Sequence, residues 1–200
     1  MCGNGELCFK WGTMNSGKSL NLLATANNFT ERGVPFILLK SSLDTRDGEN
    51  VIHSRTSQER ECIGVNVDTN LYELIVYLHQ FSPRQQVLVD EAQFLTPSQV
   101  DELAAVVDNF PINITCYGLR TDFQTKLFPG SKRLFEVADK LEEIESFCSC
   151  GDKNVFNARV DGAGDILLEG NQVEVGGEDK YVTYCRKCFY KKIGAPYYTN

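Results

Sequence analysis

The sequence predicts an α/β fold in which a mostly parallel sheet is covered by helices and is followed by a small β-rich unit. Apolar runs typical of buried strands alternate with segments whose apolar residues recur at helical spacing, a pattern typical of parallel sheets. A glycine-rich segment lies between the first expected strand and the first expected helix. Two closely spaced cysteine pairs occupy the C-terminal part of the chain.

The glycine-rich segment fits the phosphate-binding P-loop pattern G-x-x-x-x-G-K-[ST]. Its residues are Gly12, Thr13, Met14, Asn15, Ser16, Gly17, Lys18 and Ser19. An alternating strand at 6–11 precedes it, and a helix carrying Leu20, Leu22, Leu23, Ala26 and Phe29 follows. We expect its N–H groups and the helix dipole to bind phosphate, Lys18 to reach the β- and γ-phosphates of ATP, and Ser19 to hold Mg²⁺. The alternative is a glycine-rich turn with a surface lysine.

The remaining elements follow in alternation. Three signals mark the ends of helices. Gly33 follows the first expected helix, the pair Asp68-Thr69 precedes a second, and residues 96–99 form a capping box at the start of a third. A further helix is expected at 134–138. The expected strands are 35–40, 51–52, 63–67, 86–90, 112–117 and 141–147. Together these elements predict a P-loop (RecA-like) sheet.

The apolar strand at 86–90 ends in two acids, Asp90 and Glu91. The carboxyl ends of parallel strands meet at one edge of a sheet, so Asp90 and the P-loop converge there. We expect Asp90 to share Mg²⁺ with Ser19, and Glu91 to accept a proton from an attacking hydroxyl or water. The alternative is a pair of solvated acids at a strand end.

The cysteine pairs are C-x-C and C-x₂-C, formed by Cys148, Cys150, Cys185 and Cys188. Four thiolates on two short knuckles can bind Zn²⁺ tetrahedrally, and such a closed site is structural. The alternative is four buried free thiols. Cys8 and Cys116 lie in strands and are expected in the core. The resulting division is a nucleotide-binding α/β domain at 1–146 and a zinc-binding domain at 147–200.

Composition narrows the class of protein. With 42% hydrophobic and 24% charged residues, the 200-residue chain is typical of a globular protein. Its net charge of −7 argues against broad nucleic-acid binding. No apolar run approaches about 20 residues, so no membrane span is expected. Because no secretory signal is evident, we expect a cytoplasmic protein with reduced thiols.

The polar stretch after the second strand contains Asp44-Thr45-Arg46 and Ser54-Arg55. An arginine placed there can reach phosphate charge, but a solvated loop accounts for the stretch equally well.

Several motifs, in this order along the chain, resemble the cellular-type (class II) thymidine kinases, and the bacterial and phage branch most closely. They are Gly12–Ser19, Asp44–Arg46, Asp90–Phe94, Tyr117–Phe123, Gly130–Lys132, Cys148–Gly151 and Gly176-Gly177 leading to Tyr181 and Cys185–Cys188. Two features depart from the family pattern. Many relatives have C-x₂-C as the first knuckle, and the bacterial branch often has histidine where this chain has Cys188.

The resemblance implies transfer of the ATP γ-phosphate to the 5′-hydroxyl of thymidine, and of deoxyuridine, in nucleotide salvage, with Glu91 as the catalytic base. It implies that Phe123 packs beside thymine, that a "lasso" loop covers the base, and that Asp44 and Arg46 contribute to phosphate binding. The implied substrate contacts are Met14, Asp90, Glu91, Ala92, Gln93, Phe94, Phe123, Gln172, Val173, Glu174, Val175, Gly176 and Tyr181. The family is typically a homotetramer inhibited by dTTP.

Two other functions fit a P-loop beside a cysteine ribbon. One is an ATP-driven motor or switch that binds nucleic acid, against which the acidic charge counts. The other is a protein that binds nucleotide without catalysis, against which the intact set of Lys18, Ser19, Asp90 and Glu91 counts.

Overall fold

The computed structural model describes residues 5–43, 50–55, 57–81, 86–172 and 180–195. Its centre is a six-stranded sheet with the strand order β5-β2-β6-β7-β1-β8, in which every neighbouring pair is parallel. The strands are β1 (Leu7–Gly12), β2 (Phe36–Ser41), β5 (Ile63–Val65), β6 (Gln86–Asp90), β7 (Asn113–Leu119) and β8 (Lys140–Ile144). The expected α/β class with a parallel sheet is therefore confirmed.

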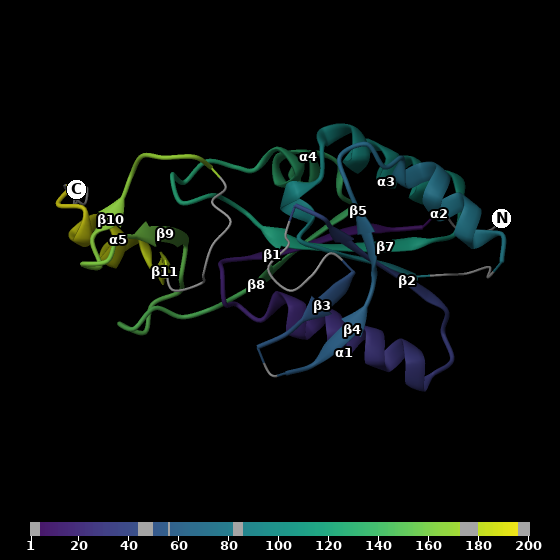
Figure 1. Cartoon of the computed structure of the whole chain (residues 1–200), viewed down its shortest axis with the longest axis horizontal. Coiled ribbons are helices and arrows are strands. Elements are labelled where there is room, and N and C mark those ends of the chain that lie inside the picture. Colours follow the sequence, from purple (N-terminus) through teal and green to yellow (C-terminus); the bar gives the residue numbers. More distant parts are fainter. Residues whose placement is uncertain (1–4, 44–49, 56, 82–85, 173–179, 196–200) are drawn as a thin grey trace.

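Helices cover both faces of this sheet (Figure 1). One face carries α1 (Lys18–Glu31). The other carries α2 (Leu71–His79), α3 (Pro97–Asn109) and α4 (Pro129–Val137), together with the short 3-10 helix η1 (Ala92–Phe94). Since both faces are covered, the central strands contain continuous apolar runs, such as ILL in β2 and VLV in β6, instead of a strict alternation with polar residues.

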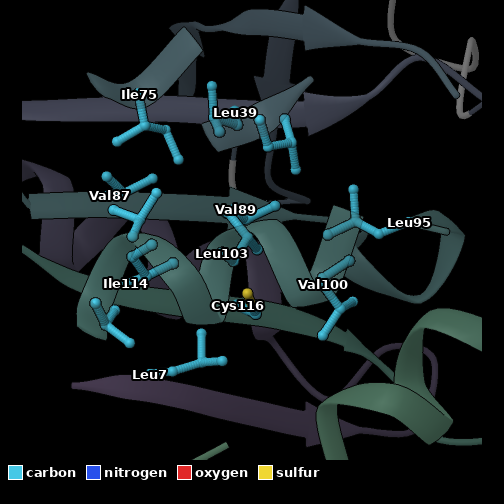
Figure 2. Close-up of a cluster of buried hydrophobic side chains, with 14 of the residues drawn as sticks. Leu7, Leu39, Ile75, Val87, Val89, Leu95, Val100, Leu103, Ile114 and Cys116 are labelled. Atoms are coloured by element: carbon cyan, nitrogen blue, oxygen red, sulfur yellow. The ribbon is translucent and has the colours of Figure 1, made fainter. Parts of the chain in front are cut away.

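Alternate residues of one strand supply the two cores. Val87 and Val89 of β6 face α2 and α3, whereas Leu88 between them faces α1. Figure 2 shows the first of these cores, in which Ile75 of α2 and Leu103 of α3 meet side chains from the sheet. The two-residue period of a strand thus turns the run VLV of β6 into contacts on both faces.

A short hairpin lies on the α1 side of the sheet and consists of β3 (Val51–His53) and β4 (Glu59–Glu61). Arg60 of β4 holds it there, because its guanidinium donates to Thr30 Oγ1 at 2.8 Å and to Asn27 Oδ1 at 3.1 Å. The charged sequence of β4 carries no strand signal, so the sequence did not predict this strand.

A second, three-stranded sheet follows β8, with the order β10-β9-β11 and antiparallel pairing. We call it the small sheet: β9 (Phe156–Val160), β10 (Ile166–Leu167) and β11 (Tyr181–Tyr184). Helix α5 (Arg186–Lys192) packs on it through Phe189, which contacts Phe156 and Ala158. The expected β-rich unit is present, while a domain boundary at residue 147 stays a prediction.

Local details differ from the sequence-based expectation at four places. Leu20 is 39% exposed, because it lies about 200° around α1 from Leu22 and so faces away from the core. The second helix is capped by Asn70, whose Oδ1 accepts from the Glu73 N–H, and not by Asp68-Thr69. Helix α4 begins five residues earlier than expected, at Pro129, and β8 ends at Ile144. Among the residues that the structure describes, no helix is long and apolar enough to cross a membrane.

The expected capping box of α3 is confirmed. Thr96 Oγ1 accepts from the Gln99 N–H at 3.1 Å, and Gln99 Oε1 accepts from the Thr96 N–H at 3.0 Å. Gln99 also donates to the carbonyl oxygens of Asn66 and Thr69, at 2.7 and 3.0 Å. This buried amide therefore fastens the loop after β5 to the start of α3.

We expect Gln99→Ala to destabilise the protein more than Thr96→Ala. The threonine change removes one cap, which costs about 1 kcal/mol. The glutamine change also strips two part-buried carbonyl groups of their partner and should cost about 2 kcal/mol. Urea unfolding of both variants measures the difference, and equal losses would show that the loop contacts contribute nothing.

Candidate active site

The candidate site lies at the edge of the large sheet where its parallel strands end. The loops that leave β1, β6 and β7 all start at this edge, and the small sheet lies beyond it (Figure 1). Residues far apart in the sequence thereby come together, as expected for an open parallel sheet.

The loop after β1 has the backbone of an anion-binding turn. Asn15 and Gly17 have left-handed φ values of 62° and 85°, and α1 starts directly afterwards at Lys18. A side chain at Gly12 would meet the Ile144 carbonyl oxygen and Ser16 Oγ, both at 2.5 Å, so glycine is needed there. The N–H groups at the start of α1 suit a phosphate group.

The lysine of the loop points back across it. Lys18 Nζ donates to the Thr13 carbonyl oxygen at 2.7 Å. This contact holds the ammonium group across the loop. A bound phosphate would compete with the Thr13 carbonyl oxygen for that ammonium group.

The expected magnesium ligands are neighbours. Ser19 Oγ donates to Asp90 Oδ2 at 3.2 Å. Asp90 is only 4% exposed, and burial together with the neighbouring Glu91 charge raises the pKa of its carboxyl group. A hydroxyl and a carboxylate are hard oxygen ligands of the kind Mg²⁺ takes, and a bound divalent cation would offset the cost of the buried charge.

Glu91 is held in an uncommon backbone conformation, with a left-handed φ of 52° at the start of η1. Gln93 Nε2 donates a short hydrogen bond to Glu91 Oε2, while Gln93 Oε1 accepts from the Leu119 N–H at 2.9 Å. A side chain at Gly118 would meet Gln93 Oε1 at 2.9 Å. The glutamine therefore ties the Glu91 carboxylate to the end of β7, and such strain at a polar site is typical of a functional residue.

Three of the residues expected near the nucleoside lie together beside the small sheet. The Arg159 guanidinium stacks 3.9 Å from the centre of the buried Phe123 ring and donates through Nη2 to Tyr181 Oη at 2.8 Å. Gln172 Nε2 donates to Asp122 Oδ2 at 2.9 Å, next to Phe123. Phe123, Gln172 and Tyr181 are thus brought to one side of the site.

Other expected site residues either pack in the protein interior or lie outside the described residues. Ala92 is fully buried in the large core, and Phe94 packs edge-on against Phe128 at 5.7 Å. The expected site residues that lie outside the described part of the chain are Asp44, Arg46, Val173, Glu174, Val175 and Gly176.

Sequence reasoning missed two residues of β9, Asn157 and Arg159. In the run FNARV they alternate with apolar residues, a pattern typical of a strand with one solvent-exposed face. Both are buried instead, Asn157 against the loops after β1 and β7 and Arg159 against Phe123 and Tyr181. The sequence predicted only a β-rich unit here, and the alternation does not show what covers the polar side of the strand.

The four expected metal ligands form one cluster. The Sγ atoms of Cys148, Cys150, Cys185 and Cys188 all lie within 4.8 Å of one another. The Cys188 N–H donates to Cys185 Sγ at 3.4 Å, and Gly151 takes the left-handed conformation in the first knuckle. Four soft thiolates fit Zn²⁺ and leave no position open for chemistry. Cys8 and Cys116 are buried in β1 and β7, as expected of core residues.

Comparison with known proteins points to one family. The family model described as "Thymidine kinase" matches residues 5–189. A thymidine kinase of Zymomonas mobilis is 44% identical over 95% of this chain and 98% of its own length. Thymidine kinases of Rhizobium meliloti and Vibrio cholerae are 46% and 42% identical, over 91% and 94% of this chain and 94% and 98% of their own lengths.

We expect the purified chain to carry about one zinc ion, since the four thiolates form a closed site. Cys150→Ser should lower the zinc content, measured by atomic emission, and lower the melting temperature. Cys62→Ser, which changes a half-buried thiol outside the cluster, serves as control and should keep its zinc. Equal zinc in both variants would contradict the assignment.

We also expect Asp90→Asn to stabilise the protein at neutral pH when no divalent cation is present. The pKa of Asp90 is raised in the folded state. Its contribution to stability is therefore fully present below the unfolded-state pKa of about 4 and is lost as the pH rises through the folded-state pKa.

Urea unfolding between about pH 5 and pH 8 checks this expectation. The gain of Asp90→Asn over the wild type should grow with pH, whereas Asp108→Asn, at an exposed position of α3, should show no such trend. A gain that does not change with pH would contradict the shift.

Proposed function

The chain belongs to the thymidine kinase family, and from that membership we propose that it transfers the γ-phosphoryl group of ATP to the 5′-hydroxyl of thymidine. The product is thymidine monophosphate, formed in nucleotide salvage, and deoxyuridine is a second acceptor. The observation that carries the proposal is the convergence of Lys18, the Ser19–Asp90 pair and the restrained Glu91 at one edge of the sheet.

The P-loop supplies the phosphate side of this reaction. Its N–H groups and the N-terminus of α1 bind the phosphates, and Lys18 exchanges the Thr13 carbonyl oxygen for phosphate oxygens. Ser19 and Asp90 hold Mg²⁺, which neutralises phosphate charge when it is bound. Asp44 and Arg46 complete the phosphate contacts of the proposal.

Glu91 acts as the general base. In the transfer, the 5′-oxygen forms a bond to the γ-phosphorus, the bond from that phosphorus to the bridging oxygen of ATP breaks, and Glu91 takes the hydroxyl proton. The hydrogen bond from Gln93 orients the carboxylate for this step, and ADP leaves with the electron pair of the broken bond. Catalysis is then mostly positioning, which suits a site whose acidic residues are fastened before substrate arrives.

The nucleoside lies on the side of the site that faces the small sheet. Phe123 packs beside thymine, Tyr181 contacts the nucleoside, and the lasso Gln172–Gly176 covers the base. Arg159 supports this arrangement, because it contacts both the Phe123 ring and the Tyr181 hydroxyl. Met14, Ala92, Gln93 and Phe94 complete the proposed substrate contacts.

The proposal also includes the domain organisation, oligomeric state, regulation and location of the enzyme. The chain forms a nucleotide-binding domain at 1–146 and a zinc-bearing domain at 147–200. The enzyme is a cytoplasmic homotetramer that dTTP inhibits by feedback. Nucleic acid and membranes are not among the proposed partners.

The test of the function is ADP release from Mg–ATP with each nucleoside in turn. Release that depends on thymidine, with thymidine monophosphate formed, supports the proposal. Release that no nucleoside stimulates, but that DNA or RNA does, would favour the motor or switch instead.

Within that assay, Glu91→Gln should lower turnover by about 10²- to 10⁴-fold, the range expected for loss of a general base. The amide keeps the size of the carboxylate, so the affinity for ATP should hardly change. Glu136→Gln, which removes a charge from an exposed ion pair with Arg133, is the matched control and should retain full turnover. Undiminished turnover of Glu91→Gln would refute the assigned role.

A further inference from the structure

Strand β9 is buried along its whole length, on both faces. Phe156 and Ala158 point into the core beneath α5. Asn157 and Arg159 alternate with them and contact loops of the large sheet. A polar side chain in such a place costs free energy unless it is hydrogen-bonded, so its partners show what it does.

Asn157 uses both ends of its amide. Its Oδ1 accepts from the Met14 N–H at 2.7 Å, and its Nδ2 donates to the Thr121 carbonyl oxygen at 3.0 Å. The side chain is 3% exposed. One residue of the small sheet therefore joins the phosphate loop after β1 to the loop after β7 that carries Phe123.

The bond to Met14 acts on the strained part of the phosphate loop. Asn15, the next residue, has a left-handed φ of 62°, and Gly17 follows with a φ of 85°. Asparagine enters the left-handed region more easily than most residues, so neighbouring contacts decide whether the loop keeps that conformation. By fixing the Met14 peptide group, Asn157 holds the loop in the conformation that presents its later N–H groups to a phosphate.

A second contact reaches the loop from the same direction. Thr13 Oγ1 and Ser146 Oγ are hydrogen-bonded at 2.8 Å, and Asn154 Nδ2 donates to Ser146 Oγ at 3.0 Å. Two successive residues of the loop, Thr13 and Met14, are thus held by the part of the chain that follows β8.

We propose that Asn157 is a positioning residue for phosphoryl transfer, which holds the phosphate loop in its binding conformation and links that loop to the one carrying Phe123. The expected effect of Asn157 on turnover rests on the proposed function. The expected effect of Asn157 on nucleotide binding requires only that the P-loop binds a nucleotide, whatever the acceptor of the phosphoryl group.

The test compares Asn157→Leu with Val160→Ala in the full-length chain. Leucine has the same branched side-chain skeleton as asparagine but makes neither hydrogen bond. Val160 lies in the same strand and is buried, but its side chain is on the opposite face from Asn157 and so points away from the phosphate loop. Its truncation should therefore destabilise the small sheet without touching that loop. The melting temperature, the Kd of Mg–ATP in the absence of thymidine, and kcat and KM for each substrate are measured for both.

We expect Asn157→Leu to weaken Mg–ATP binding and to lower kcat/KM for ATP by about tenfold or more, because the part-buried Met14 N–H group loses its acceptor. Val160→Ala should keep both within about twofold of the wild type at a comparable loss of melting temperature. Equal binding losses in the two variants, or unchanged binding in Asn157→Leu, would overturn the proposal.

A smaller variant covers the case in which Asn157→Leu fails to fold. Asn157→Ala removes both hydrogen bonds and adds neither bulk nor charge. It should also weaken Mg–ATP binding by about tenfold or more. Affinity of Asn157→Ala for Mg–ATP within about twofold of the wild type would overturn the proposal. If the wild type showed no thymidine-dependent turnover, the proposed function would fail, and the binding comparison would still decide the role of Asn157.

Discussion

The site depends first on the parallel register of β1, β6 and β7. Phe9 and Val89 both pair with Cys116 of the strand between them, so Gly12, Asp90 and Leu119 reach the same edge of the sheet. The phosphate loop, the proposed magnesium ligand Asp90 and the anchor of Gln93 start from that edge. Because side chains alternate between faces, a slip of one residue in β6 would also exchange the side chains that face α1 and α3. The packing of the two cores and the geometry of the site are therefore set by the same register.

The polar groups at that edge are costly to the folded protein. Asp90 is buried beside another acid, and Asn15 and Glu91 hold left-handed conformations. These features cost the folded chain free energy, and in the proposed function they would be used when a cation and phosphates bind, an arrangement typical of active sites. The two apolar cores on either side of the sheet offset this cost.

The small sheet completes the site because it contributes side chains as well as cover. Asn157 and Arg159 stand on one face of β9, the first bonded to the phosphate loop and the second to Phe123 and Tyr181. The cysteine cluster lies close by in sequence, with Cys150 ahead of β9 and Cys185 directly after β11. A metal held by both knuckles would fix the strands that carry these residues. The stability of the small sheet and the geometry of the proposed nucleoside site are therefore connected.

The sequence by itself determined the parallel sheet, the phosphate loop, the acids after β6, the capping box of α3 and the four clustered thiols. Each of these is encoded locally, by periodicity or by residue types at short spacing, and short-range patterns can be recognised without a fold. Only the tertiary structure decided that the polar face of β9 is buried, that Gln93 ties Glu91 to Leu119, and that charged β4 packs on α1 through Arg60. These contacts join residues distant in sequence, and an alternating polar residue looks the same whether water or another loop covers it.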